Sequence, residues 1–194
     1  MKGKLSSRDL TVMIVIAVAG AALYVFAFPD GAITTLMHQV LKLPGPGAGI
    51  GFLVGPAIIA CSLFTHLLIK KKWTALITAL AFGSIRIGLA LNSAEAAPNS
   101  FGVVKPLIGL LVLAVSVELL VKLLEKKSLL IKLTVSAVAS DITYMIAYWV
   151  IVFPATKGWV ALGDVPVLLL VTVIGAVLFG ALLPALMLKI LRKA

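Results

Sequence analysis

Apolar residues gather along this chain into six long runs, separated by shorter segments that hold most of the charged side chains. The runs cover residues 10–28, 49–69, 73–92, 101–124, 128–153 and 165–191. A helix rises about 1.5 Å per residue, so even the shortest run spans roughly 28 Å, close to the hydrocarbon thickness of about 30 Å. The pattern predicts an all-α membrane protein built as a six-transmembrane-helix bundle.

Basic residues are unevenly shared between the segments that join these runs. Thirteen of the 17 Lys and Arg residues lie in four segments that alternate along the chain, around 2–8, 70–72, 122–132 and 189–193. The intervening segments carry only Lys42, Lys105 and Lys157, and Arg86 lies inside a run. The positive-inside rule then predicts that both termini are cytoplasmic. The net charge of +10 is explained by topology, so we expect no nucleic-acid partner.

Composition supports a single integral membrane domain over residues 1–194. The chain is 62% hydrophobic and 12% charged, which leaves too few polar residues to cover a water-soluble fold. No segment between the runs is longer than about 20 residues, so no hydrophilic domain is expected. The first run belongs to a multi-pass pattern, so we do not expect it to be a removed signal peptide. One cysteine, Cys61, excludes an intramolecular disulfide.

Two charged residues, Arg86 and Asp141, lie inside apolar runs, where an ionisable side chain costs about 2.5–3.5 kcal/mol on insertion scales. Each follows a basic segment by 14 residues in a helix that runs outward, so both are predicted at the same depth, in the outer half. A shared depth permits an ion pair, which either locks helices together or belongs to a binding pocket.

The fifth run adds Tyr144 and Tyr148 to the same helix face as Asp141, at spacings of three and seven residues. Polar tips among apolar and aromatic walls are typical of small-molecule pockets. The stripe therefore predicts a substrate-binding surface made of Asp141, Tyr144 and Tyr148, with Arg86 beside it.

The segment after the first run contains a short stretch of mixed character. Pro29, Asp30 and Gly31 end the first helix, residues 32–43 suit an interfacial outer helix, and Pro-Gly-Pro-Gly at 44–47 ends it. Such a segment either anchors at the interface or covers the pocket, in which case it brings His38 and Gln39 to the substrate. Asn92 is expected at the outer rim.

Ala17 and Ala21 in the first run are four residues apart and share one helix face. Small side chains allow another helix to approach closely, either within this chain or from a separate subunit. Near the cytoplasmic side, Glu118 is expected either to pair with Lys122 one turn away or to extend its carboxylate to the interface, and His66 to have a packing role.

Catalytic motifs are missing from the sequence. There is no nucleophile elbow, no His-Glu-x-x-His and no phosphate-binding loop, and only two histidines occur, at distant positions. We therefore expect no enzyme activity, no cofactor, no bound metal and no ATPase site of its own.

The whole chain resembles a substrate-binding S component of an energy-coupling factor (ECF) transporter, the vitamin-uptake family. The resemblance consists of the chain length, six helices with both ends inside, an outer segment after the first helix, Ala17 and Ala21, and a last helix that contains Gly175 and Gly180. It implies that a small water-soluble vitamin or heterocyclic precursor binds from the outer face. It also implies that the Ala17 and Ala21 face docks on a transmembrane coupling subunit driven by two ATPase subunits, in a prokaryotic cell membrane.

Two other classes remain open. A self-sufficient secondary transporter would use Arg86 and Asp141 as an ion relay and is expected to contain internal repeats or broken helices, and no convincing repeat is visible. The second open class is a non-catalytic structural subunit of a membrane complex.

Overall fold

The fold is known from a computed structural model that describes residues 4–27, 35–43, 48–91, 101–151, 161–191 and 193. These residues form helices and connecting turns, and the described ranges contain no strand. The helices are α1 (Ser7–Ala27), α3 (Gly55–Ile69), α4 (Thr74–Leu91), α5 (Phe101–Leu123), α6 (Leu129–Ile151), α7 (Val165–Gly175) and α8 (Leu183–Leu191), with π-helical segments η1 (Thr35–Val40), η2 (Ile50–Val54) and η4 (Ala176–Leu182). The predicted all-α class is confirmed.

The helical segments agree with the six apolar runs to within three residues at each end. The second run consists of η2 and α3, and the sixth consists of α7, η4 and α8, which follow one another without a break. Five of the described helices are long and apolar enough to cross a membrane: Ser7–Ala27, Ile50–Ile69, Pro106–Leu123, Leu129–Ile151 and Val165–Leu191. The remaining run is represented by a shorter apolar helix, Thr74–Gly88. The chain therefore has the helices of a multi-pass membrane protein.

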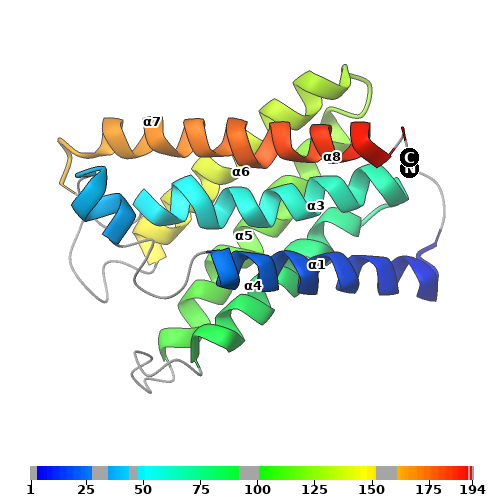
Figure 1. The fold of residues 1–194 in the computed structure, drawn as a ribbon, viewed down its shortest axis with the longest axis horizontal. Coiled ribbons are helices and arrows are strands. Elements are labelled where there is room, and N and C mark those ends of the chain that lie inside the picture. Colours follow the sequence, from blue (N-terminus) through cyan, green and yellow to red (C-terminus); the bar gives the residue numbers. More distant parts are fainter. Residues whose placement is uncertain are drawn as a thin grey trace.

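Helix α3 is the centre of the arrangement and packs against α1, α4, α6, η4 and α8. Figure 1 shows α1, α3 and the α7–α8 run lying nearly parallel, with α4, α5 and α6 behind them. Helix α1 begins and α8 ends at the same end of the bundle, where α3 also ends (Figure 1). We call this the basic end, because Arg8, Lys70 and Lys189 belong to these helix ends.

Glycines allow two of the helical runs to cross closely. A side chain at Gly51 would overlap Thr172, and one at Gly175 would overlap the backbone of Phe52. The backbones of η2 and the α7–η4 junction therefore touch, which only glycine permits at these positions. This contact holds the last helical run against η2, the segment that leads into α3.

Hydrogen bonds and one ion pair hold the basic end. Ser6 and Asp9 cap α1 reciprocally: Ser6 N donates to Asp9 Oδ2 at 2.7 Å, and Asp9 N donates to Ser6 Oγ at 3.3 Å. Lys71 Nζ, in the turn between α3 and α4, lies 2.6 Å from Asp9 Oδ2. His66 is buried, with its ring Nδ1 3.0 Å from Oγ1 of Thr74, the first residue of α4. These contacts join the starts of α1 and α4.

Glu118 was expected to be satisfied near Lys122, but its carboxylate bonds to the start of α4. Its carboxylate accepts hydrogen bonds from the backbone N–H groups of Trp73 at 2.6 Å, Ala75 at 3.1 Å and Leu76 at 3.4 Å. The first N–H groups of a helix have no acceptor within the helix, so a buried carboxylate from α5 satisfies the start of α4. Trp73 adopts a left-handed backbone conformation with φ of 69°, which turns the chain into this position.

Candidate functional site

Polar side chains from three helices gather within the bundle. We call Tyr24 of α1, Arg86 of α4, and Asp141, Tyr144 and Tyr148 of α6 the polar cluster. The Arg86 guanidinium carbon lies 5.5 Å from the centre of the Tyr24 ring, a cation–π distance. The rings of Tyr144 and Tyr148 meet edge to face with centroids 6.0 Å apart. Of the residues predicted from the sequence, Tyr144 and Tyr148 are thus in contact with each other.

Electrostatic interactions connect the members of the cluster. Arg86 interacts with both Tyr144 and Tyr148. Tyr144 interacts in addition with Asp141 and Tyr24.

Asp141 is the most unusual member. Its side chain is completely buried, and within the described ranges neither carboxylate oxygen has a hydrogen-bond partner. Gly55 of α3 packs directly against it, because a Cβ atom at position 55 would overlap Asp141 Oδ1. The hydroxyl of Ser140, also buried on α6, likewise has no partner among the described residues. A buried polar group without a partner costs about 1–3 kcal/mol, and more when it is charged.

The ion pair that a shared depth permits between Arg86 and Asp141 is not formed. No carboxylate of the described chain lies within ion-pair distance of Arg86, which stacks on Tyr24 instead. Equal distance from a basic segment fixes depth, but it does not fix the direction in which a side chain leaves its helix. Asp141 faces Gly55 of α3, whereas Arg86 faces Tyr24 of α1.

The other predicted site residues lie elsewhere. His38 and Gln39 on η1 are exposed, and the ring Nδ1 of His38 lies 3.0 Å from Leu43 O in its own segment. Asn92 lies outside the described residues.

Ala17 and Ala21 are fully buried in the core of this chain. Helix α1 packs against α3 and α4, so the small-residue face is filled by internal packing. This corrects the expectation that the face docks a separate subunit, because the close approach that small side chains permit has been used within the bundle.

Tyr24 was not predicted. It is a buried aromatic residue near the end of α1, and its ring also meets Phe82 edge to face at 6.5 Å. The sequence contains one indication of its role, because Tyr24 lies close to the non-basic end of its run, as Tyr144 and Tyr148 do in theirs. Its approach to Arg86 depends on the packing of α1 on α4.

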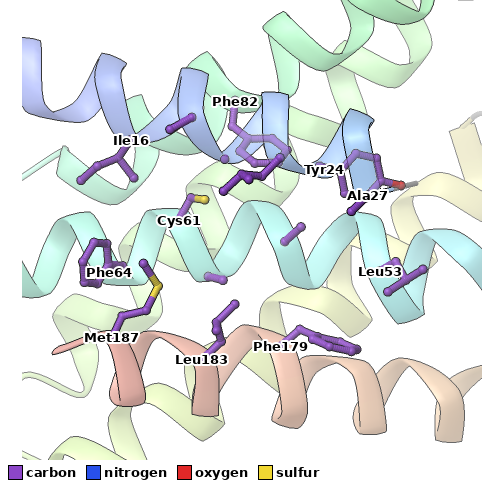
Figure 2. Close-up of a pocket in the computed structure, with 15 residues that line it drawn as sticks. Ile16, Tyr24, Ala27, Leu53, Cys61, Phe64, Phe82, Phe179, Leu183 and Met187 are labelled. Carbon is purple, nitrogen blue, oxygen red and sulfur yellow. The ribbon is translucent and has the colours of Figure 1, made fainter. Parts of the chain in front are cut away.

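A concave region, which we call the apolar groove, runs between α1 and the η4–α8 segment with α3 as its floor. Its volume is about 350 Å³. Figure 2 shows Ile16 and Phe82 on one side, Cys61 and Phe64 along the floor, and Leu183 and Met187 opposite. The side chains that line it offer only the Tyr24 hydroxyl and the Cys61 thiol as polar groups. The groove suits hydrocarbon and has little with which to orient a water-soluble molecule.

No protein-family model matches this chain, and no significant match was found among curated proteins or solved structures.

Proposed function

We propose that this protein is a substrate-capture subunit of an ECF-type importer in a prokaryotic cell membrane. In this proposal it binds a small water-soluble metabolite, a vitamin or a heterocyclic precursor, at the polar cluster. The substrate enters from the outer face, and a coupling subunit with two ATPase subunits drives its release inward.

The observation that supports this proposal most strongly is the environment of Asp141. Charged groups within membrane helices normally face a partner, a cavity or water, because an unpaired charge in the bilayer is costly. Asp141 has no partner in the described chain, and its neighbours Tyr144 and Tyr148 have the amphipathic rings that bind small molecules. A polar substrate supplies the missing hydrogen bonds, which gives a function to an otherwise unfavourable group.

Docking has to use another surface than Ala17 and Ala21. Val15 and Val18 on α1 are 58% and 47% exposed, and they belong to the outer face of this helix. In the proposed assembly the coupling subunit contacts these side chains in the plane of the membrane. Val15→Trp is then expected to reduce energised uptake while binding by the isolated subunit is retained.

The test of binding compares two carboxylates in the purified protein. We expect a metabolite to copurify with the wild-type protein in lipid nanodiscs, detectable by native mass spectrometry. Asp141→Asn should weaken its binding roughly 10- to 150-fold, the value of a hydrogen bond to a charged group. Asp9→Asn, which changes a carboxylate at the basic end, is the matched control and should bind normally. Equal binding by wild type and Asp141→Asn would remove the support for this site.

Orientation is tested separately by cysteine labelling in a Cys61→Ala background. With both termini cytoplasmic, a cysteine at Lys71 should react with an impermeant reagent only from inside. A cysteine at Lys157 should react from outside. Labelling of both positions from outside would contradict the proposed topology.

A second candidate is a proton-coupled secondary transporter, favoured by the same lack of a counter-ion at Asp141. A carboxyl group that is buried without a cation is suited to bind and release a proton. Uptake by the protein alone, reconstituted in liposomes and driven by a pH gradient, would favour this class. Uptake only with ATP and ATPase subunits would favour the importer.

A further inference from the structure

The apolar groove opens sideways from the bundle. Its floor, α3, lies between α1 and the last helical run (Figure 1) and packs against both. Leu23 on α1 and Leu183 and Met187 on the last run line the groove and are exposed. Because these helices are long and apolar enough to cross a membrane, side chains exposed along their flanks face lipid. The groove is therefore open to hydrocarbon.

The length of the groove matches one leaflet of a bilayer. On α1 the groove extends from Ile16 to Ala27, and on α3 it extends from Leu53 to Phe64. Each segment rises by about 16 Å, close to half of a hydrocarbon thickness of about 30 Å. Helix α1 starts at the basic end, so Ile16 lies about 14 Å and Ala27 about 30 Å along the helix from its first residue. The groove thus occupies the leaflet opposite the basic end.

The width of the groove distinguishes between a helix and a single chain as its occupant. A volume of about 350 Å³ spread over about 16 Å gives a mean width of roughly 5 Å. A helix with its side chains is about 10–12 Å wide, so it can lie only across the opening. Carbon atoms in contact are about 3.5–4.0 Å apart, so one hydrocarbon chain has the width that the groove accepts.

The lining of the groove favours a chain of methylene groups. The Tyr24 hydroxyl and the Cys61 thiol are its polar side-chain groups, and Phe64, Phe82 and Phe179 supply aromatic surface (Figure 2). A ligand with polar atoms along its length would bury them without hydrogen bonds, whereas a hydrocarbon chain has none to satisfy.

From its length, width and lining we infer that the apolar groove binds one acyl chain of a membrane phospholipid, drawn from the leaflet opposite the basic end. The ester end of the chain lies by Ala27 and Leu53, and the terminal methyl group lies by Ile16, Phe64 and Met187. The bound chain fills the space between α1 and the last helical run. This ligand is separate from the proposed substrate, so the inference does not depend on substrate capture.

The first experiment maps the chain in the wild-type protein. Vesicles of dipalmitoylphosphatidylcholine contain a trace of the same lipid with a photoreactive diazirine, placed either beside the ester or at the chain terminus. Leu53 and Phe64 are buried in the floor, so lipid on the outer surface of the bundle does not reach them. After irradiation and mass spectrometry of peptides, we expect the ester-end probe to label Leu53 and the terminal probe to label Phe64.

A second experiment fills the groove. Ala57 lies on the floor between Leu53 and Phe64, so Ala57→Phe places a ring in the path of the chain. This variant should lose labelling of Phe64 by the terminal probe. It should also lose the single phospholipid that we expect the wild type to retain in native mass spectrometry from detergent. Val18→Phe adds the same ring to the exposed face of α1 outside the groove and is the matched control. It should behave as the wild type does.

Three results would overturn the inference. The first is labelling of neither Leu53 nor Phe64, which is the result expected if a helix of another protein or of a second copy covers the groove. The second is the reverse order of labelling along the floor. The third is unchanged labelling and lipid retention in Ala57→Phe. Mapping in the wild type needs no substitution, so it decides the matter even if Ala57→Phe folds poorly.

Discussion

Glu118 and Asp141 are buried carboxylates of adjacent helices, and their surroundings are opposite. Glu118, near the basic end, accepts three backbone hydrogen bonds and closes the start of α4. Asp141, further from that end, accepts none from the described chain. Both side chains are at most 6% exposed, so solvent does not distinguish them.

The difference separates two uses of charge inside a membrane protein. A carboxylate that completes a helix end is satisfied by the fold itself, and removing it leaves backbone N–H groups unpaired. A buried carboxylate without a partner opposes folding through its desolvation, so removing its charge should leave the neighbouring helices intact. Substitution therefore distinguishes the two kinds of carboxylate: replacing a structural one lowers the stability of the fold, and replacing a ligand-binding one does not.

The largest effect is expected for Glu118→Ala. Loss of the acceptor leaves the N–H groups of Trp73, Ala75 and Leu76 without a partner in a buried place, at a cost of about 2–4 kcal/mol. Glu118→Gln keeps one acceptor oxygen and should lose less than half of that. Unfolding in mixed micelles measures both free energies. A Glu118→Ala protein as stable as the wild type would remove the contrast with Asp141.

An intermediate effect is expected for Gly55→Ala. A methyl group there overlaps Asp141, so α3 and α6 must move apart, and overpacking of this kind costs about 1–3 kcal/mol. The matched control is Gly88→Ala on α4, where a Cβ atom meets nothing within 4 Å. That change should leave stability unchanged or increase it slightly, because alanine favours helix. Equal melting temperatures for the two variants would contradict the close contact between Gly55 and Asp141.

A smaller loss of stability is expected for Asp141→Asn and Arg86→Gln. Asp141→Asn removes the charge of an unpartnered buried carboxylate and should not lower stability. Arg86→Gln should lose about 0.5–1 kcal/mol with its cation–π contact to Tyr24. Because the two side chains do not touch, the double variant should equal the sum of the single changes. A double variant that restores a stability lost in each single variant would reveal a direct ion pair. Thermal unfolding of all three variants beside the wild type decides this.

The smallest effect is expected for Lys71→Ala at the basic end. Its partner Asp9 retains the capping contacts with Ser6, and the pair is partly exposed, so salt and water already weaken it. The melting temperature should fall by less than it does for Gly55→Ala, and the difference should shrink in high salt. A larger fall would mean that the turn between α3 and α4 depends on this ion pair.

Most of the fold was predictable from hydropathy, because each helical run is long, apolar and bounded by charge, proline or glycine. The run at 165–191 coincides with the continuous α7–η4–α8 segment. What hydropathy cannot provide is the direction of side chains between helices. Glu118 had a neighbour of opposite charge one turn away. Its carboxylate nevertheless reaches α4, because the backbone N–H groups at the start of that helix are donors without an acceptor of their own.

The candidate site was predictable in part for the same reason. Asp141, Tyr144 and Tyr148 lie on one helix face, so periodicity alone groups them. Tyr24 and the separation of Arg86 from Asp141 depend on how α1 and α4 rotate about their axes, which no single run determines. Ala17 and Ala21 showed that a close helix contact exists, but the sequence pattern does not identify the partner helix.

The hydrogen bond from Trp73 N to Glu118 joins residues that are 45 positions apart in the sequence, and this separation matters during synthesis and membrane insertion. Helix α4 carries Arg86 and is represented among the candidate spans only by a shorter apolar stretch. When α4 leaves the ribosome, the carboxylate that will complete its first turn has not yet been synthesised. We therefore expect α4 to wait beside the membrane-insertion machinery until α5 emerges, so that the two helices enter the lipid together.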